Sequence, residues 1–352
     1  MVAFPSQPAG LRADAGDRRI RRMEAPADGA MVRPHGPRLP LRVGTRASPL
    51  ALWQTREFLN LITRFCPVLR NAKAFEEHQI ATSGDLIQDR RLAEIGGKGL
   101  FAKEIHEALL DGRVDFAVHS LKDLETALPP GIVLACTLQR EDPRDALILG
   151  AGFECAVDPA RPFDCLPHGA LIGTSSVRRQ SQILHQRPDL RIGMIRGNVQ
   201  TRLGKLRRGE AAASMLAIAG LKRLEMEQEA DIVIDEDIMV PAACQGIVGV
   251  TVRADDEELC ELLSAIEDPT ARAVSSAERA LLGALDGSCR TPIGGYAVPQ
   301  PGGGLKLTGL VARADGSFLL RRTWEGTMRD AVRLGEELGD SLRRDAPADI
   351  FS

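Results

Sequence analysis

The first strong pattern in the chain predicts a helix that begins near residue 48. Ser48 is a natural N-cap, and Pro49 suits the first helical position. Pro67 stands beyond the predicted end of this helix. Four apolar residues recur at helical spacing, and we expect them to face a core: Leu52, Leu59, Ile62 and Phe65.

A second amphipathic segment follows at residues 99–113 and predicts another helix that stops near Gly112. Its expected core side chains are Phe101, Ile105, Ala108 and Leu109. In the next stretch, "VDFAVH" (114–119), Val114, Phe116 and Val118 alternate with other residues, which predicts a short strand. Helices that interleave with strands in this way indicate an α/β fold.

Residues 139–147 are charged and contain Pro143, which is typical of a crossing between domains. A second α/β unit follows them. It consists of a strand that runs into a turn (170–176), a helix stopped by Pro188, a strand (190–198) and a further helix (198–209). In the last helix, Val199, Leu203 and Leu206 are expected to point inward.

A third unit begins near residue 268 with a helix in which Ala277, Leu281 and Leu285 share one face. The remaining sequence alternates like antiparallel strands, two of which are joined by the turn Asp315-Gly316. No internal repeat of fixed period is present.

The composition fits a soluble globular protein of two or three domains, because 44% of the 352 residues are hydrophobic and 26% are charged. Aromatic residues make up only 4% of the chain, which disfavours a stacking platform for single-stranded nucleic acid. The net charge of −3 gives no general attraction to nucleic acid or to membranes. The longest uncharged apolar run, 211–221, is too short to span a bilayer.

The segment 1–40 holds six prolines and seven arginines but no apolar core of a secretory signal. Its acidic residues also disfavour a transit peptide, so we expect a disordered N-terminal extension. The seven cysteines contain no C-x-x-C pair, which is typical of reduced thiols in a cytoplasmic protein. Cys289 differs from the others because its neighbours, in "GSCRTPIGG", are turn formers.

Positive charge is concentrated in residues 173–223, where nine arginines and two lysines face only Asp189 and Glu210. Arg178 and Arg179 fall in the first turn of a predicted helix, and Arg196 falls at the end of a predicted strand. These positions favour an anion site, since ligands of open α/β sheets bind at strand ends and helix N-termini. A solvated basic face is the alternative interpretation. Arginines near helix C-termini are expected at the surface: Arg187, Arg207 and Arg208.

Two further segments suggest chemistry. The loop "GGKGL" (96–100) lacks the Ser or Thr of a P-loop, but its glycines suggest a flexible loop whose Lys98 could close over an anion. A plain glycine-rich loop is the alternative. Lys122-Asp123 follows a predicted strand, where a carboxylate can project into a cleft. A solvated Lys-Asp pair is the alternative.

Nine segments occur together and in order, and with them the chain resembles the porphobilinogen deaminase family over residues 41–345. They are "GTRASPLALWQ", "GGKGLFAKEI", "DFAVHSLKD", "REDPRDAL", "GTSSVRRQ", "IRGNVQTRLGKL", "AGLKRL", "ERALLGALDGSC" and "PIGGYA". The resemblance implies a transferase of tetrapyrrole and heme biosynthesis. It would condense four porphobilinogen molecules head to tail into hydroxymethylbilane and release ammonia. It also implies a dipyrromethane cofactor, bound to Cys289 by a thioether.

Matched residue by residue, the resemblance makes Asp123 the catalytic acid. It would protonate the departing amine and then stabilise a cationic azafulvene-like intermediate. The residues matched to binding of cofactor and substrate carboxylates are Arg46, Ser48, Lys98, Lys122, Arg178, Arg179, Arg196, Arg202 and Arg223. No metal ligand is implied.

The implied fold has two domains like periplasmic binding proteins of type II, which flank a cleft, and a smaller C-terminal α/β domain with the cofactor cysteine. Domain 1 would comprise residues 41–140 together with 246–265. Domain 2 would comprise 141–245 and carry the arginine-rich anion cleft, and domain 3 would comprise 266–352. We expect a cytoplasmic monomer with a small-molecule substrate and with neither nucleic acid nor membrane as a partner.

The chain departs from the family pattern at two positions near the expected site. Glu125 stands where proline is usual, and Cys244 stands where glycine is usual. The segment "GEAAASMLA" (209–217) also lacks the aspartate that the family usually has before its apolar run. The alternative function is a periplasmic-type carboxylate-binding protein without catalysis, which would need no cysteine on a loop and would need an export signal.

Overall fold

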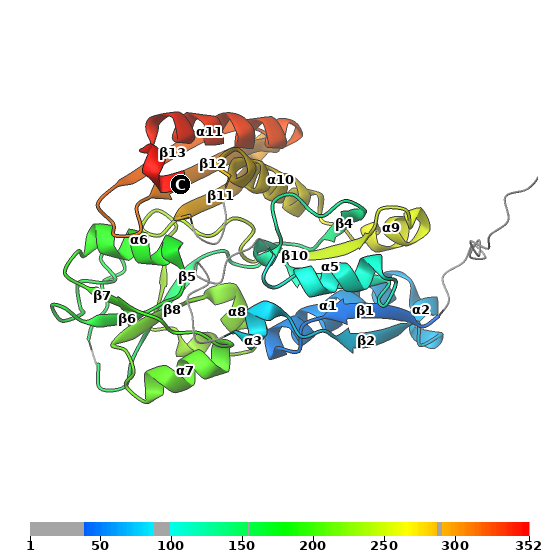
Figure 1. Cartoon of the computed structure of the whole chain (residues 1–352), viewed down its shortest axis with the longest axis horizontal. Helices are drawn as coiled ribbons and strands as arrows, with labels where there is room; N and C mark the ends of the chain where they lie inside the picture. Colours follow the sequence, from blue (N-terminus) through cyan, green and yellow to red (C-terminus); the bar gives the residue numbers. More distant parts are fainter. Residues whose placement is uncertain (1–38, 88–98, 154, 287–290, 352) are drawn as a thin grey trace, which may run out of the picture. The chain divides into compact units, whose positions relative to one another are not determined.

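The computed structural model describes residues 39–87, 99–153, 155–286 and 291–351. Within these residues, the strands form two sheets of five and one sheet of three (Figure 1). No helix in this part of the chain is long and apolar enough to cross a membrane. The expected α/β class is confirmed.

The first sheet has the strand order β2-β1-β3-β10-β4. Its strands are β1 (Leu41–Thr45), β2 (Phe75–Gln79), β3 (Phe116–Ser120), β4 (Ile132–Thr137) and β10 (Val248–Arg253). β1 is parallel to β2 and β3, while β10 is antiparallel to both of its neighbours. The helices of this part are α1 (Pro49–Phe65), α2 (Pro67–Asn71), α3 (Ser83–Leu86), α5 (Lys103–Leu110) and α9 (Glu257–Ser264).

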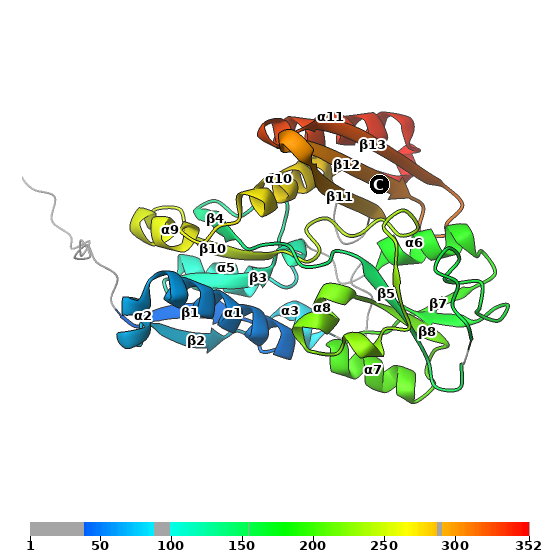
Figure 2. The same cartoon turned by 180° about the vertical axis from the view of Figure 1, so that it is seen from behind.

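The second sheet repeats this arrangement in the order β7-β6-β8-β5-β9. Its strands are β5 (Asp145–Leu149), β6 (Leu171–Gly173), β7 (Arg191–Gly193), β8 (Ala213–Ala217) and β9 (Ile232–Ile234). Its helices are α6 (Val177–Gln186), α7 (Val199–Arg207) and α8 (Ile218–Arg223). Seen from either side, α6 and α7 lie on opposite sides of this sheet (Figure 2).

In each of these sheets, the fourth strand is antiparallel and arrives by a crossing of the chain. β5 follows β4 into the second sheet, and β10 follows β9 back into the first. Two crossing segments, residues 138–144 and 235–247, therefore run between the sheets. Any side chain on them can contact residues of both sheets.

The third sheet, β11-β12-β13, is fully antiparallel. It consists of β11 (Ile293–Gln300), β12 (Gly304–Ala312) and β13 (Leu319–Thr327), and its helices are α10 (Pro269–Ala284) and α11 (Ala331–Asp345). Leu281 and Leu285 pack in one core with β12 and α11, as predicted. The predicted turn Asp315-Gly316 joins β12 to β13, and Gly316 has the positive φ that such turns need.

Local signals located the first helix well, but not its buried face. Ser48 caps α1 by accepting a hydrogen bond from the Ala51 N–H at 3.3 Å, and Pro49 is its first residue. Phe65, expected in the core, is 60% exposed, whereas Phe58 and Ile62 are fully buried. The prediction for Phe65 was wrong because α1 ends there and a new helix turns away at Pro67.

One strand prediction is confirmed and another needs correction. Residues 116–119 lie in the predicted strand, β3, and are all buried. β3 lies in the middle of the sheet, where both faces are covered. β7 ends at Gly193, so Arg196 lies beyond the strand and not at its last residue.

Candidate functional site

A cavity of about 90 Å³ lies at the ends of β1 and β3. Its lining includes Arg46, Ser48, Gln54, His119, Lys122 and Asp123. β1 and β3 are parallel neighbours, so the residues that follow them meet at one edge of the sheet. Arg46 comes directly after β1, and Asp123 lies in the short turn η1 (Leu121–Asp123) directly after β3. This edge is where open α/β sheets bind ligands.

Asp123 lies beside the guanidinium of Arg46, with 3.4 Å between its Oδ2 and Nη1 of Arg46. Arg46 is held in place by Asp85, to which its Nε donates a hydrogen bond at 3.0 Å. The guanidinium also stacks 4.3 Å from the ring centroid of Phe101. Asp85 is in turn fixed by Thr82, whose hydroxyl lies 2.7 Å from its Oδ2. No local pattern in the sequence pointed to Asp85, because its role depends on contact with Arg46, 39 positions away.

The wall of the cavity also contains two polar residues that sequence reasoning missed. Gln54 bonds to the hydroxyl of Ser120 at 2.9 Å. His119 is buried, and its Nε2 lies 2.9 Å from the hydroxyl of Thr251. Burial, together with the charges of His106 and Arg46, lowers the pKa of His119 to about 3. His119 is therefore a neutral wall of the cavity at physiological pH.

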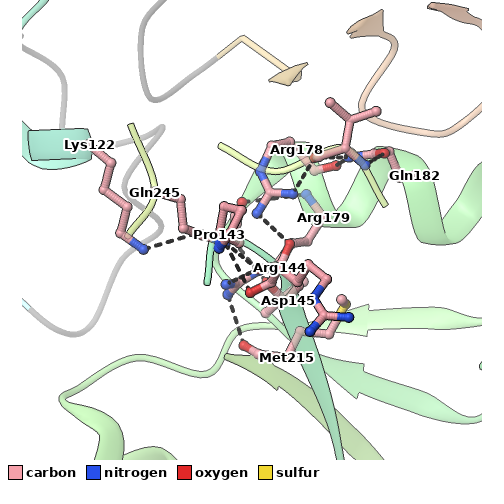
Figure 3. Close-up of polar contacts among 12 residues, drawn as sticks. Lys122, Pro143, Arg144, Asp145, Arg178, Arg179, Gln182, Met215 and Gln245 are labelled. Atoms are coloured by element: carbon pink, nitrogen blue, oxygen red, sulfur yellow. Dashed lines mark hydrogen bonds and ion pairs between the residues drawn. The ribbon is translucent and has the colours of Figure 1, made fainter. Parts of the chain in front are cut away.

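A second polar cluster surrounds Asp145, the first residue of β5, which is fully buried (Figure 3). Arg178 and Arg179, from the first turn of α6, both pair with its carboxylate, at 2.8 Å and 2.7 Å. Burial opposes the ionisation of Asp145, but these two arginines hold its pKa well below the usual range. The carboxylate thus keeps two neighbouring cations together.

Arg178 and Arg179 differ in how many of their nitrogens are already bonded. All three nitrogens of Arg179 donate hydrogen bonds, two to Asp145 and one to the carbonyl of Met215. Arg178 donates to the carbonyl of Val240 at 2.8 Å, while its Nε is buried and has no hydrogen-bond partner among the residues described. Burial lowers the pKa of Arg178, which Asp145 counteracts. Arg178 and Arg179 are thus buried side chains whose nitrogens are largely bonded within the protein, unlike arginines on an open surface.

Gln245, on the second crossing segment, joins the two clusters (Figure 3). Its side-chain amide donates to Asp145 at 3.0 Å and to the carbonyl of Pro143 at 2.6 Å. Its carbonyl oxygen accepts a hydrogen bond from Nζ of Lys122 at 3.1 Å. One carboxamide thereby links the residue beside Asp123 to the arginine pair on α6.

Lys122 is exposed, yet desolvation by the surrounding protein lowers its pKa to about 8. A lysine that is accessible to solvent but surrounded by protein stands on the wall of a recess. Its ammonium group remains mostly charged at neutral pH, but it loses its proton more readily than a lysine on an open surface.

The other predicted anion ligands lie on α7, α8 and the loop before α7. Arg196 is buried and donates to the carbonyl of Gly84 at 3.2 Å. Arg202 is half-buried, and burial with the charges of Arg179 and Arg196 lowers its pKa to about 10. Asp123 opposes that shift, which places its charge within reach of Arg202.

Arg223 lies apart from these residues. It donates to the carbonyl of Gly246 at 2.6 Å, and its guanidinium is 5.8 Å from the ring centroid of Trp53. Burial lowers its pKa to about 10. It therefore contacts the second crossing segment and α1, and not the Asp145 cluster.

Of the arginines predicted at the surface, Arg187 is half-buried and donates to the carbonyls of Phe163 and Leu166, so that prediction was wrong. Arg207 and Arg208 are exposed and pair with Glu229 and Glu210. Two predicted site residues, Lys98 and Cys289, lie outside the described residues, as does nearly all of the expected extension 1–40. Among the residues that are described, no group of three or more potential metal ligands is present.

The arrangement pairs one carboxylate at a cavity with many buried cations. Such a site can bind a small molecule with several carboxylates and can place a proton or a negative charge at one point of it.

Comparison with known families gives two matches that together cover most of the chain. Residues 41–261 match "Porphobilinogen deaminase, dipyromethane cofactor binding domain". Residues 273–344 match "Porphobilinogen deaminase, C-terminal domain".

Similar curated proteins carry the same family name. A porphobilinogen deaminase from Paracoccus denitrificans is 46% identical over 315 residues, covering 90% of this chain and 97% of the relative. The one from Sorangium cellulosum is 45% identical, covering 86% of this chain and 98% of the relative. The chloroplastic protein of Oryza sativa is 44% identical, covering 88% of this chain and 85% of the relative.

Solved structures similar in part include a substrate-binding protein of an amino acid ABC transporter. It is 14% identical, has a TM-score of 0.36 and covers 67% of this chain and 94% of its own. A periplasmic arginine-binding protein from Salmonella typhimurium is 14% identical and has a TM-score of 0.35. The match covers 66% of this chain and 93% of that protein.

Proposed function

The chain belongs to the porphobilinogen deaminase family, and on that premise we propose that Asp123 is its catalytic acid. As a member, it is a transferase that joins porphobilinogen units into hydroxymethylbilane with loss of ammonia, and it uses a dipyrromethane cofactor. A binding protein without catalysis is not favoured by these matches.

The observation that carries the role of Asp123 is its position at the cavity between Arg46 and Lys122. A proton held on its carboxyl can pass to the amine that leaves the substrate. The carboxylate that results then lies next to the carbon that becomes positive. Arg46, 3.4 Å away, keeps the carboxylate oriented, and Asp85 keeps Arg46 oriented.

The cations around this cavity fit the dipyrromethane cofactor, which carries acetate and propionate groups. Lys122 is exposed, and the buried Nε of Arg178 has no hydrogen-bond partner in the part of the chain that the structure describes. We propose that the carboxylates of cofactor and substrate are held by Arg46, Ser48, Lys98, Lys122, Arg178, Arg179, Arg196, Arg202 and Arg223. When bound, the cofactor supplies the pyrrole end that each added unit extends. We further propose Cys289 as its thioether anchor.

The proposal also includes the organisation of the chain. Residues 41–140 with 246–265 would form domain 1, residues 141–245 domain 2 and residues 266–352 domain 3. The position of β10 within the first sheet supports this division. We place the protein in the cytoplasm, and the seven cysteines without a C-x-x-C pair support that location. We also propose that it is a monomer. Light scattering after size-exclusion chromatography would test the monomer.

Single-turnover kinetics of Asp123→Asn and Asp123→Glu tests the proposed acid. Asparagine keeps the shape of the side chain but carries neither the proton nor the charge. General acid catalysis typically accelerates a reaction about 10²- to 10⁴-fold. The single-turnover rate of the Asn variant should therefore fall toward the upper end of that range or beyond, because the negative charge is lost as well. The Glu variant keeps the charge on a longer arm and should retain partial activity. An Asn variant within tenfold of the wild type would place the acid elsewhere.

A further inference from the structure

Two residues beyond Asp123, the carboxyl group of Glu125 is enclosed in the protein. Its side chain is 11% exposed. The backbone carbonyls of Glu125 and Thr126 both accept hydrogen bonds from Nη2 of Arg279, at 2.7 Å each. The backbone just after the Asp123 turn is therefore tied to α10, while the Glu125 side chain packs against α5 and Gly99.

The partner of Glu125 is His106 on α5, whose side chain is 3% exposed. Nδ1 of His106 lies 3.7 Å from Oε2 of Glu125, which is too long for a hydrogen bond. Among the described residues, neither ring nitrogen of His106 has a hydrogen-bond partner, and neither does Oε2 of Glu125. Buried polar atoms without partners are rare and costly, so this pair is in a state that a small movement can improve.

The surroundings enclose the pair on both sides. A Cβ added to Gly99 would lie 1.8 Å from Oε1 of Glu125, so the carboxyl group packs directly against that backbone. The ring of His119 on β3 lies 5.8 Å from the ring of His106, centroid to centroid. Among the described residues, the charged or titratable groups that act on the pair are His119 from β3 and Arg279 from α10. Burial lowers the pKa of His106, and the charge of Glu125 raises it.

We propose that His106 and Glu125 are a positioning pair that moves the Asp123 turn when the imidazole takes up a proton. The added proton comes from solvent and turns His106 into a cation. A charge-assisted hydrogen bond to Glu125 then forms at about 2.8 Å, so the two groups must approach by roughly 1 Å. A displacement of that size at a catalytic group can cost about 10²-fold in rate. The inference rests on the proposed role of Asp123.

The pair itself is tested by the NMR titration of His106 in the full-length protein, which needs no catalysis. Glu125→Gln removes the charge and keeps the shape, so the midpoint of the His106 titration should move to lower pH. Glu107→Gln removes an exposed carboxylate from the same helix and is the matched control. The His106 signal is assigned with His106→Gln. If the midpoint of the His106 titration is unchanged in Glu125→Gln, the proposed coupling between His106 and Glu125 is wrong.

The effect on Asp123 is tested by single-turnover rates between about pH 8 and about pH 5, a range that extends well below the usual histidine pKa of about 6.5 because burial lowers the pKa of His106. Wild type, Glu125→Gln, His106→Gln and the double variant should agree within about threefold at the upper pH. At the lower pH the wild type should be about tenfold slower than all three variants, and the double variant should match the singles. A purely structural role would give variant-to-wild-type ratios that do not change with pH, which would refute the proposal. A wrong assignment of Asp123 would instead appear as activity in Asp123→Asn.

Discussion

Replacing Asp145 with asparagine should destabilise the protein more than any other single loss of charge near the site. Its carboxylate is fully buried and compensates two guanidinium groups, those of Arg178 and Arg179. Asparagine fills the same volume but leaves both cations without a counter-charge. Breaking a buried ion pair from one side typically costs about 3–5 kcal/mol, and we expect a loss in that range at neutral pH. That is a large share of the stability of a typical domain.

The pH dependence of this loss follows from the depressed pKa of Asp145. A group whose pKa is lower in the folded state stabilises the fold above its unfolded pKa, here about 3.9. That contribution is lost as the pH falls through the folded-state pKa. The difference between wild type and Asp145→Asn should therefore be constant above about pH 5 and should shrink below about pH 4.

Urea unfolding followed by far-UV circular dichroism measures this difference. Asp189→Asn is the matched control, because Asp189 also pairs with an arginine, Arg187 at 2.7 Å, but at the partly exposed end of the same helix. The decrease in the free energy of unfolding should be much smaller for Asp189→Asn than for Asp145→Asn. A loss below about 1 kcal/mol in Asp145→Asn, the range of exposed ion pairs, would refute the argument from burial.

Two further predictions concern anion binding. Arg178→Leu should weaken binding of the cofactor or of porphobilinogen about ten- to a hundredfold, which is the usual effect of losing a charge-assisted contact. Arg207 is exposed, so Arg207→Leu should have little effect on binding. Isothermal titration measures both affinities, and equal small effects would favour a solvated basic face. Because the pKa of Lys122 is about 8, substrate affinity should fall as the pH rises through that value. Lys122→Arg, which stays charged, should keep its affinity at higher pH, and a wild-type affinity that is flat between about pH 7 and 9 would contradict this.

Features set by neighbouring residues were predictable from the sequence. The start of α1 follows from Ser48 and Pro49, and the turn between β12 and β13 follows from Asp315-Gly316. Local order also placed Asp123 just after a strand. In each case the physical cause, a cap, a fixed φ or a strand end, lies within a few positions of the residue concerned.

Features set by long-range contacts were not predictable from the residues alone. Asp145 and Arg179 are 34 positions apart, and Gln245 reaches Lys122 across 123 positions. The first contact exists because β5 pairs with β8 in the second sheet, and the second exists because the crossing segment 235–247 returns to the first sheet. Long-range contacts of this kind explain why the arginines, expected as open ligands, are partly occupied by Asp145 and by backbone carbonyls.

The central claim is that this chain extends a covalently held pyrrole chain with Asp123 as the acid. Intact mass spectrometry of the purified protein, before and after a short exposure to porphobilinogen, tests it most directly. Wild type should carry a dipyrromethane adduct and then a ladder of additions, each equal to one porphobilinogen less ammonia. Cys289→Ala should have the unmodified mass, and Asp123→Asn should show few or no additions. An adduct on Cys289→Ala, or a full ladder on Asp123→Asn, would contradict the account.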